Sequence, residues 1–155
     1  MVAQGSKVSF SMHGVGVSNG IAIGHAHIIS NALVEVVHYQ IPKKALVAEI
    51  LRFEQALERV RHDLEIIREQ LPVTAPTELA AFINTHLMIL ADKHLSEAPK
   101  AIIEQELCNA EWALKQQMSE LVAQFELIDD EYLRERKQDV VQVVERIIKV
   151  LLGHP

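Results

Sequence analysis

Histidine is the residue type in this chain best suited to chemistry near neutral pH. His25 and His27, in GHAHI, would face one side of a strand and could share a metal ion, but no third or fourth ligand of suitable spacing follows. His86 stands in HLMIL, at the border of an apolar helical face, with no second histidine or carboxylate placed in sequence to orient it. The patterns favour two sheet histidines and one buried or interfacial histidine whose ring nitrogens are hydrogen-bonded. A metal enzyme using His25, His27 and His86 is the least favoured hypothesis.

Three further patterns resemble chemical sites only superficially. In GVGVSNG the third glycine comes one residue later than in a dinucleotide fingerprint, and no amphipathic helix follows directly. Cys108 is the only cysteine, so no disulfide can form within one chain, and we expect it to be structural. Asp129, Asp130 and Glu131 could bind magnesium or act as acid and base, but helix capping explains them more simply.

The residues after His86 leave two interpretations open. Met88, Asp92 and Leu95 fall on successive turns beside a core stripe. An exposed methionine and leucine near an acid would form an adaptable binding patch, or both could pack against the next helix. By their spacing among aliphatic residues, Trp112, Met88 and Met118 are better explained as core filling than as a cofactor pocket.

Composition predicts one mainly α-helical domain without nucleic-acid or membrane partners. The 155 residues are 49% hydrophobic and only 5% aromatic, enough to bury a core and typical of helices. The net charge of −6 is concentrated between residues 97 and 131, which argues against binding to phosphate backbones. Without a secretion leader or an uninterrupted apolar run of about 18 residues, we expect a cytoplasmic protein.

Apolar spacing predicts strands followed by an antiparallel helical bundle. Residues 14–39 mix glycine with β-branched residues, as strands and turns do. An apolar heptad seam predicts a helix over 45–71, and prolines then separate it from a second helix over 78–91 capped by Thr77. We expect a short helix over 96–107, a longer one capped by Asn109, and a last one over 128–153. The strands have no sheet to join, which indicates a sheet elsewhere in a longer protein.

Three stretches together resemble the N-terminal part of enzyme I, the phosphoenolpyruvate-protein phosphotransferase of the bacterial sugar phosphotransferase system. They are GVGVSNGIAIGHAHI, ELAAFINTHLMILADKHLSE and IDDEYLRERKQDVVQVVERIIKVLLG. The resemblance implies that residues 1–41 lead an incomplete α/β phosphohistidine domain and that residues 42–153 form a helical subdomain of two hairpins that docks the carrier HPr. The family's phosphorylated histidine segment is missing here, as is the barrel that carries the phosphoenolpyruvate and magnesium site and joins the full-length enzyme into a homodimer.

The resemblance also supplies a partner-binding set and no catalytic residue. Met88, Ile89 and Leu95 would give apolar contact, Glu78 and Asp92 would attract a basic rim, and Arg136 would orient a polar contact. The full set is Glu78, His86, Met88, Ile89, Asp92, Leu95, Leu133 and Arg136. The chain alone is thus expected to bind and not to phosphorylate.

Two departures from the family pattern leave the carrier open. Lys93 and His94 replace acids of the pattern, which would also suit the HPr-like partner of a nitrogen-type paralogue. The rival hypothesis is a helical scaffold that self-associates through the heptad seam and has no role in phosphotransfer.

Overall fold

The computed structural model describes residues 11, 13–17, 19–21, 23–24 and 35–153, apart from the side chain of Leu133. The chain divides into two units, residues 1–31 and 32–155. In the first unit the described residues form neither helix nor strand, and His25 and His27 lie outside them. The strands predicted over residues 14–39 are therefore absent from the described part of that range.

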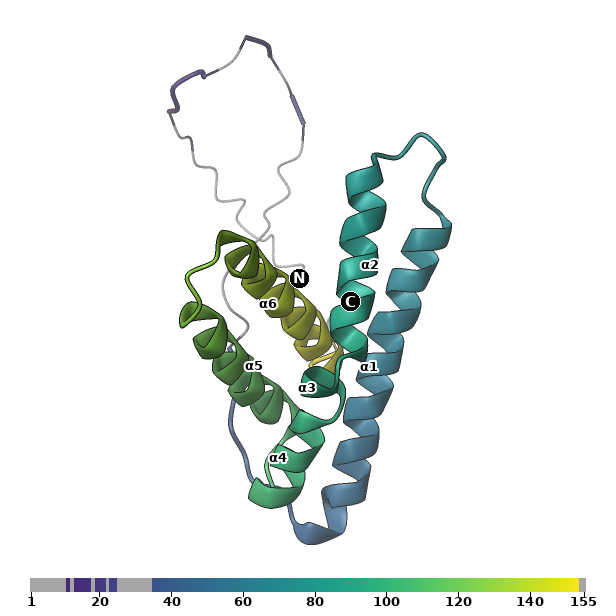
Figure 1. Ribbon diagram of the computed structural model, residues 1–155, viewed down its shortest axis with the longest axis vertical. Coiled ribbons are helices and arrows are strands. Elements are labelled where there is room, and N and C mark those ends of the chain that lie inside the picture. Colours follow the sequence, from purple (N-terminus) through teal and green to yellow (C-terminus); the bar gives the residue numbers. More distant parts are fainter. Residues whose placement is uncertain (1–10, 12, 18, 22, 25–34, 154–155) are drawn as a thin grey trace, which may run out of the picture. The chain divides into compact units, whose positions relative to one another are not determined.

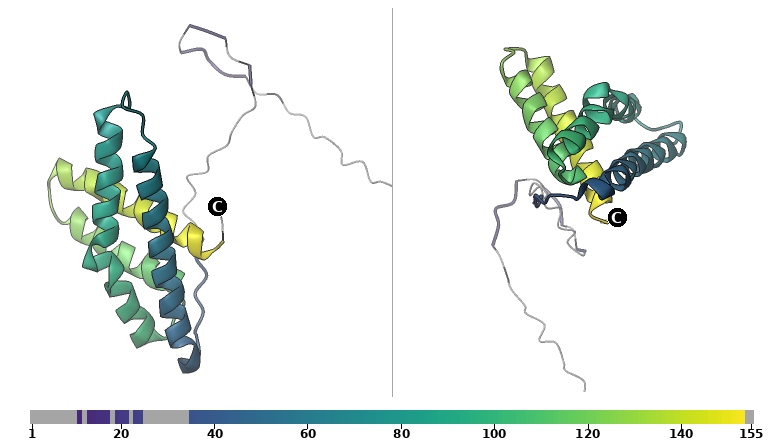
Figure 2. Two further views of the ribbon diagram at one scale, coloured as in Figure 1. Left: turned by 90° about the vertical axis from the view of Figure 1, so that its right-hand side faces the viewer. Right: turned by 90° about the horizontal axis from the view of Figure 1, so that it is seen from below.

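The second unit is mainly α, as predicted. Its described residues form η1 (Lys43–Ala45), α1 (Leu46–Glu69), α2 (Thr77–Ala91), α3 (Lys93–Ser96), α4 (Ala98–Glu106), α5 (Ala110–Glu126) and α6 (Glu131–Leu151). The helices α1 and α2 form one antiparallel hairpin and α5 and α6 form another, which crosses the first obliquely (Figures 1 and 2). The short α3 and α4 connect the two hairpins.

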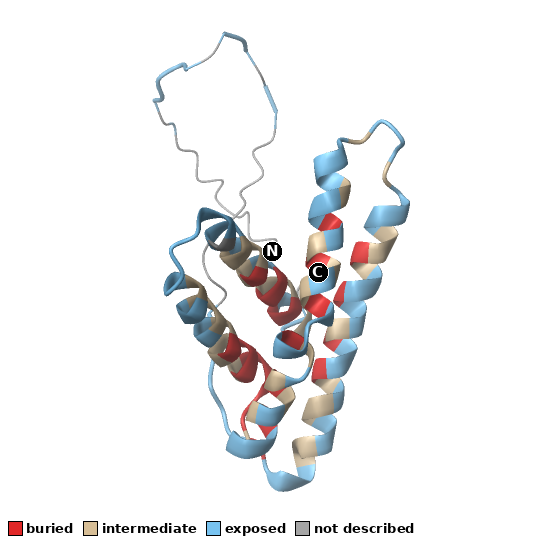
Figure 3. Ribbon diagram, in the orientation of Figure 1, coloured by how far each residue is buried: buried red, intermediate tan, exposed pale blue. Residues whose placement is uncertain are grey.

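The heptad seam of α1 packs against the other helices of the same chain. Phe53, Val60 and Leu64 are buried, and Ile67 near the end of the helix is partly exposed. Figure 3 shows that the buried positions of the helices lie where the two hairpins face each other. Because α1 packs against α2, α4, α5 and α6, the seam is unavailable for the self-association that the rival hypothesis requires.

Prolines separate α1 from α2, but the predicted cap is wrong. Thr77 is the first residue of α2, and Pro76 occupies the N-cap position without a side-chain hydrogen bond. The extended backbone of Pro76, with ψ of 139°, supplies the turn into the helix in place of a capping side chain.

The helix predicted over residues 96–107 is α4, and the short α3 before it was not predicted. Asp92 caps the one-turn α3, and α4 then ends at Leu107, which adopts a left-handed conformation with φ of 50°. Its N–H donates to the Ile103 carbonyl, while its own carbonyl accepts the N–H of Ile41. Leu107 thereby turns the chain from α4 toward α5, and Gln40 forms an isolated antiparallel bridge with Cys108.

The ends of α6 confirm the capping interpretation. The Asp130 carboxylate accepts the backbone N–H of Tyr132 at 2.8 Å, so the acids before α6 serve its first turn. Gly153 follows the helix with φ of 73°, a conformation that favours glycine.

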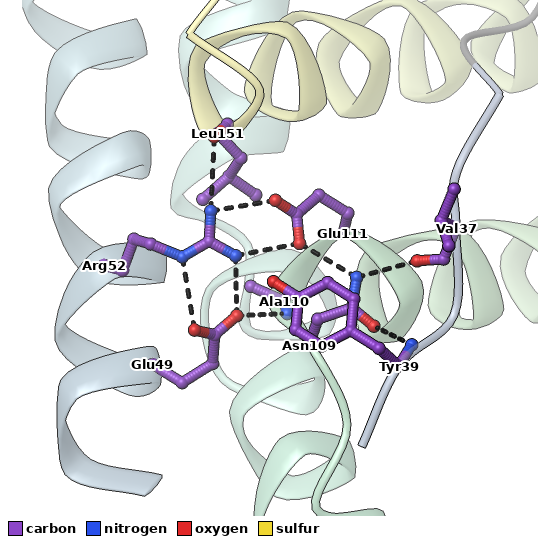
Figure 4. Close-up of polar contacts among 8 residues, drawn as sticks. All are labelled: Val37, Tyr39, Glu49, Arg52, Asn109, Ala110, Glu111 and Leu151. Carbon is purple, nitrogen blue, oxygen red and sulfur yellow. Dashed lines mark hydrogen bonds and ion pairs between the residues drawn. The ribbon is translucent and has the colours of Figure 1, made fainter. Parts of the chain in front are cut away.

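A polar network joins α1, α5 and the end of α6 (Figure 4). The Arg52 guanidinium donates two hydrogen bonds of 2.8 Å to the Glu111 carboxylate and two to Glu49, and a further one to the Leu151 carbonyl. Burial opposes the charge of Glu111, but hydrogen bonds from Arg52 and Asn109 outweigh it, and the pKa of this carboxyl lies below its ordinary value. The network therefore fixes how the second hairpin meets α1.

Asn109 extends this network to the segment before α1. It occupies the predicted N-cap position of α5, but its amide N–H groups donate to the Val37 carbonyl and to Glu111, and its side-chain oxygen accepts the N–H of Tyr39. Glu49 instead accepts the first free N–H of α5, from Ala110, at 2.7 Å. A residue distant in sequence thus provides the cap that the adjacent asparagine was predicted to give.

Candidate functional site

A groove of about 300 Å³ lies between the two hairpins. Helix α2 with Asp92 and α3 forms one wall, and α5 with α6 forms the other. The lining side chains belong to Thr85, Met88, Ile89, Asp92, His94, Leu95, Leu121, Phe125, Arg136 and Val140. The fold thus unites in one place Met88, Ile89, Asp92, Leu95 and Arg136 of the predicted partner-binding set.

Met88 is the main exposed apolar side chain of the groove. It is 74% exposed, although its spacing suggested core filling, while Ile89 beside it is half-buried against the core. The exposed interpretation of Met88 is therefore correct. A flexible thioether beside half-buried aliphatic residues makes an adaptable contact surface.

Asp92 stands at the rim and is already hydrogen-bonded within the chain. One carboxylate oxygen accepts the backbone N–H of His94 at 2.8 Å and lies 2.7 Å from its ring Nδ1. These bonds, the backbone one first, hold the pKa of Asp92 below its ordinary value, so the carboxylate is charged at neutral pH. Asp92 therefore combines a structural role, capping α3, with a negative charge in the groove.

Arg136 brings a positive charge from the opposite wall. Its Nε and one terminal nitrogen donate to the Tyr132 hydroxyl one turn earlier, at 3.2 and 2.6 Å, and the guanidinium carbon lies 5.1 Å from the centre of the Tyr132 ring. Tyr132 thus orients Arg136 at the side of the groove.

The prediction that Leu95 gives apolar contact to a partner is wrong. It is 1% exposed and lies at the floor of the groove, because the single turn of α3 directs it into the core. It cannot supply exposed apolar contact area to a partner.

His86 is a second correction. It is 1% exposed, so its burial is confirmed and the prediction of a partner-facing side chain is wrong. The expected hydrogen-bonded imidazole is also wrong, because neither ring nitrogen has a hydrogen-bond partner among the described residues. Its Nε2 lies 3.7 Å from the carboxylate of Asp139 on α6, a neighbour that the sequence did not indicate. Burial lowers the pKa of His86 and outweighs the opposing effect of Asp139.

Of the remaining predicted residues, Glu78 does not line the groove. Glu78 is exposed in the first turn of α2, about 15 Å along the helix from Met88 at 1.5 Å per residue. The side chain of Leu133 is outside the described part of the chain.

Five lining residues were not predicted: Thr85, His94, Leu121, Phe125 and Val140. Leu121 and Phe125 are one turn apart on α5 and were interpreted as part of an inward stripe. They are half-buried, at the end of the stripe where α5 leaves the core. The only sequence signal for them is this position near the helix end.

Other candidate chemistry finds no support in the described residues. Within them, no three His, Cys, Asp or Glu side chains are grouped to hold a metal ion. Cys108 is fully buried, and burial raises the pKa of its thiol, in agreement with a structural role. No helix in the described ranges is long and apolar enough to span a membrane.

Comparison with known proteins identifies the relatives. A family model described as PEP-utilising enzyme, N-terminal, matches residues 13–136. The phosphoenolpyruvate-protein phosphotransferase of Cupriavidus necator is 48% identical over 146 residues, covering 94% of this chain and 25% of that protein. The Bacillus subtilis protein of the same name is 34% identical over 142 residues, covering 92% of this chain and 25% of its own length.

A solved structure supports the same assignment. The NMR solution structure of Enzyme I matches with a TM-score of 0.71 and 32% identity, over 77% of this chain and 48% of that one. The chain spans about a quarter of the length of the curated relatives it matches. The resemblance to enzyme I is confirmed, and the chain belongs to the family of PEP-utilising enzyme N-terminal regions.

Proposed function

We propose that this chain is the carrier-docking part of a phosphoenolpyruvate-protein phosphotransferase and that the groove between its hairpins binds HPr or an HPr-like phosphocarrier. In the longer relatives, phosphate would pass from phosphoenolpyruvate to a histidine and then to the carrier, with magnesium at the phosphoenolpyruvate site. Residues 1–41 would lead into the phosphohistidine domain and residues 42–153 would hold the carrier. Holding two reacting groups in line can supply much of the acceleration of a transfer step.

The observation that carries the proposal is the 74% exposure of Met88 beside half-buried apolar walls. Single exposed apolar side chains are common on protein surfaces, but Met88 lines one groove with the half-buried Ile89, Leu121 and Phe125. Apolar side chains gathered in one place are typical of an interaction site. Asp92 and Arg136 stand at its two sides, so a partner with an apolar centre and polar rim would find both kinds of contact.

Charge at the rim supports two kinds of carrier. Asp92 at the rim, and Glu78 farther along α2, would attract basic groups, whereas Lys93 and His94 next to Asp92 reduce that attraction. Both HPr and the HPr-like protein of the nitrogen-type pathway therefore belong in the test, in the cytoplasmic setting expected for this pathway.

A calorimetric or NMR titration with each carrier tests docking. Met88→Glu places a charge in the apolar centre, and we expect it to weaken binding by about tenfold or more, which corresponds to about 1.4 kcal/mol. Val47→Glu is the matched control, because Val47 is 78% exposed on α1 and does not line the groove. Asp92→Asn removes the rim charge while keeping an oxygen that can cap α3.

Two results would contradict the proposal. One is the absence of binding to either carrier, and the other is equal weakening by Met88→Glu and Val47→Glu. Incubation of the chain with radiolabelled phosphoenolpyruvate and magnesium tests whether it is phosphorylated by itself. A chain that only docks the carrier takes up no label.

A further inference from the structure

His86 is a buried polar side chain that the proposed docking does not use. Neither ring nitrogen has a hydrogen-bond partner among the described residues, and the side chain is 1% exposed. The closest polar group is the Asp139 carboxylate, 3.7 Å from Nε2, which is just beyond hydrogen-bonding distance. A buried nitrogen without a partner costs free energy, so the position of this imidazole calls for an explanation.

The charged groups near the imidazole of His86 come from a single helix, α6. Asp139 and Arg146, both on α6, act on its charge with opposite sign. The Phe82 ring lies 4.1 Å from the imidazole between centroids and is itself 40% exposed, so it separates His86 from solvent. Helix α1, which also packs against α2, buries apolar residues such as Val60 and Leu64.

The two partners belong to the two walls of the groove. His86 precedes Met88 and Ile89 by two and three residues on α2, and Asp139 lies between Arg136 and Val140 on α6. We propose that His86 is a positioning residue, whose contact with Asp139 sets the separation of α2 and α6 and thereby the width of the groove. This inference rests on the proposed function, because the groove matters as a docking site.

Protonation is the event that would change the contact. When the imidazole takes a proton from solvent, both nitrogens become donors, and attraction to Asp139 draws the pair from 3.7 Å toward about 2.8 Å. The walls then approach each other and the carrier loses contact area. Because burial lowers the pKa of His86, the open neutral pair is the populated form at neutral pH, and the closed form appears in acid.

An NMR titration of the chain without any carrier tests the coupling. From about pH 7.5 to about pH 5, we expect the Met88 methyl signal to shift with the same midpoint as the His86 ring signal. The shift should be lost in His86→Gln and in Asp139→Asn, and persist in His94→Gln, which changes the exposed histidine that lines the groove with Met88. Phe82→Ala admits water to the imidazole and should move both midpoints to higher pH together.

A second measurement relates the coupling to docking. The ratio of HPr affinity above the midpoint of the His86 ring titration to that below it should be about fivefold larger for the wild type than for His86→Gln, with the titration of HPr common to both. A Met88 midpoint different from that of His86, or a shift that persists in His86→Gln, overturns the inference. If HPr binds no variant at any pH, the proposed function fails, and the carrier-free titration alone decides the role of His86.

Discussion

The buried imidazole of His86 makes the stability of the chain depend on pH. Burial lowers its pKa in the folded state, whereas the unfolded chain keeps a value of about 6.5. Between the folded-state and unfolded-state pKa values the unfolded state binds more protons than the folded state. The stability that neutral His86 contributes is therefore fully present above about pH 6.5 and is lost as the pH falls through the folded-state pKa. We expect His86→Gln to have a smaller loss of unfolding free energy between about pH 7 and about pH 5, measured by urea denaturation.

His62→Gln is the control for this prediction, because His62 is exposed on α1. The same loss of stability in His86→Gln as in the wild type would assign the acid sensitivity to other groups.

Single side chains were predicted well where local spacing determines their position. The burial of His86 and the cap at Asp130 follow from helix periodicity and from helix ends, both of which are local. The contact of His86 with Asp139 joins residues 53 positions apart, and no local pattern encodes it. Leu95 was misplaced because a one-turn helix rotates it inward, and so short a helix leaves no periodicity to read.

Helices with long apolar repeats were the most predictable elements. The seam of α1 and the capped α6 were found with their ends displaced by only a few residues. The one-turn α3 was missed, because it depends on capping by Asp92 and is too short to show an apolar repeat. Leu107 in a left-handed conformation also has no signal in its residue type.

The network around Arg52 should determine how the helices are held together. Arg52→Met leaves the carboxylates of Glu49 and Glu111 facing each other without a cation, and the Glu111 side chain is only 6% exposed. We expect a loss of about 2 to 3 kcal/mol in unfolding free energy, less than for a fully buried pair because Arg52 is partly solvated. Urea denaturation at neutral pH measures it.

Arg59→Met on the same helix is the matched control. Arg59 pairs with Asp63 at the surface, and its side chain is 69% exposed, so its loss should cost at most about 0.5 kcal/mol. Equal costs for the two substitutions would mean that the Arg52 network adds no more than a surface ion pair.

The groove belongs to the assembled bundle and not to any one helix. Most of its α2 wall and Arg136 of the opposite wall were predicted through the family resemblance, but Leu121, Phe125 and Val140 of the second hairpin were not. Their contribution depends on the crossing of the two hairpins, which the network at the far end of α6 helps to fix. A single sequence gives helix faces but not the angle at which two hairpins meet.

The packing of α1 inside the bundle makes a last prediction about assembly. Phe53 has no exposed surface, so Phe53→Ala should lower the unfolding free energy by about 3 to 4 kcal/mol, while Leu51→Ala, at a half-exposed position of α1, should cost about 0.5 kcal/mol.

A dimer built on the seam would make the thermal midpoint rise with protein concentration, because association stabilises the folded state by mass action. Since the seam is already covered by the chain's own helices, we expect the thermal midpoint to stay constant over a hundredfold range of protein concentration, about 1 to 100 µM. A midpoint that rises with concentration in the wild type and not in Phe53→Ala would support the rival hypothesis of self-association through α1.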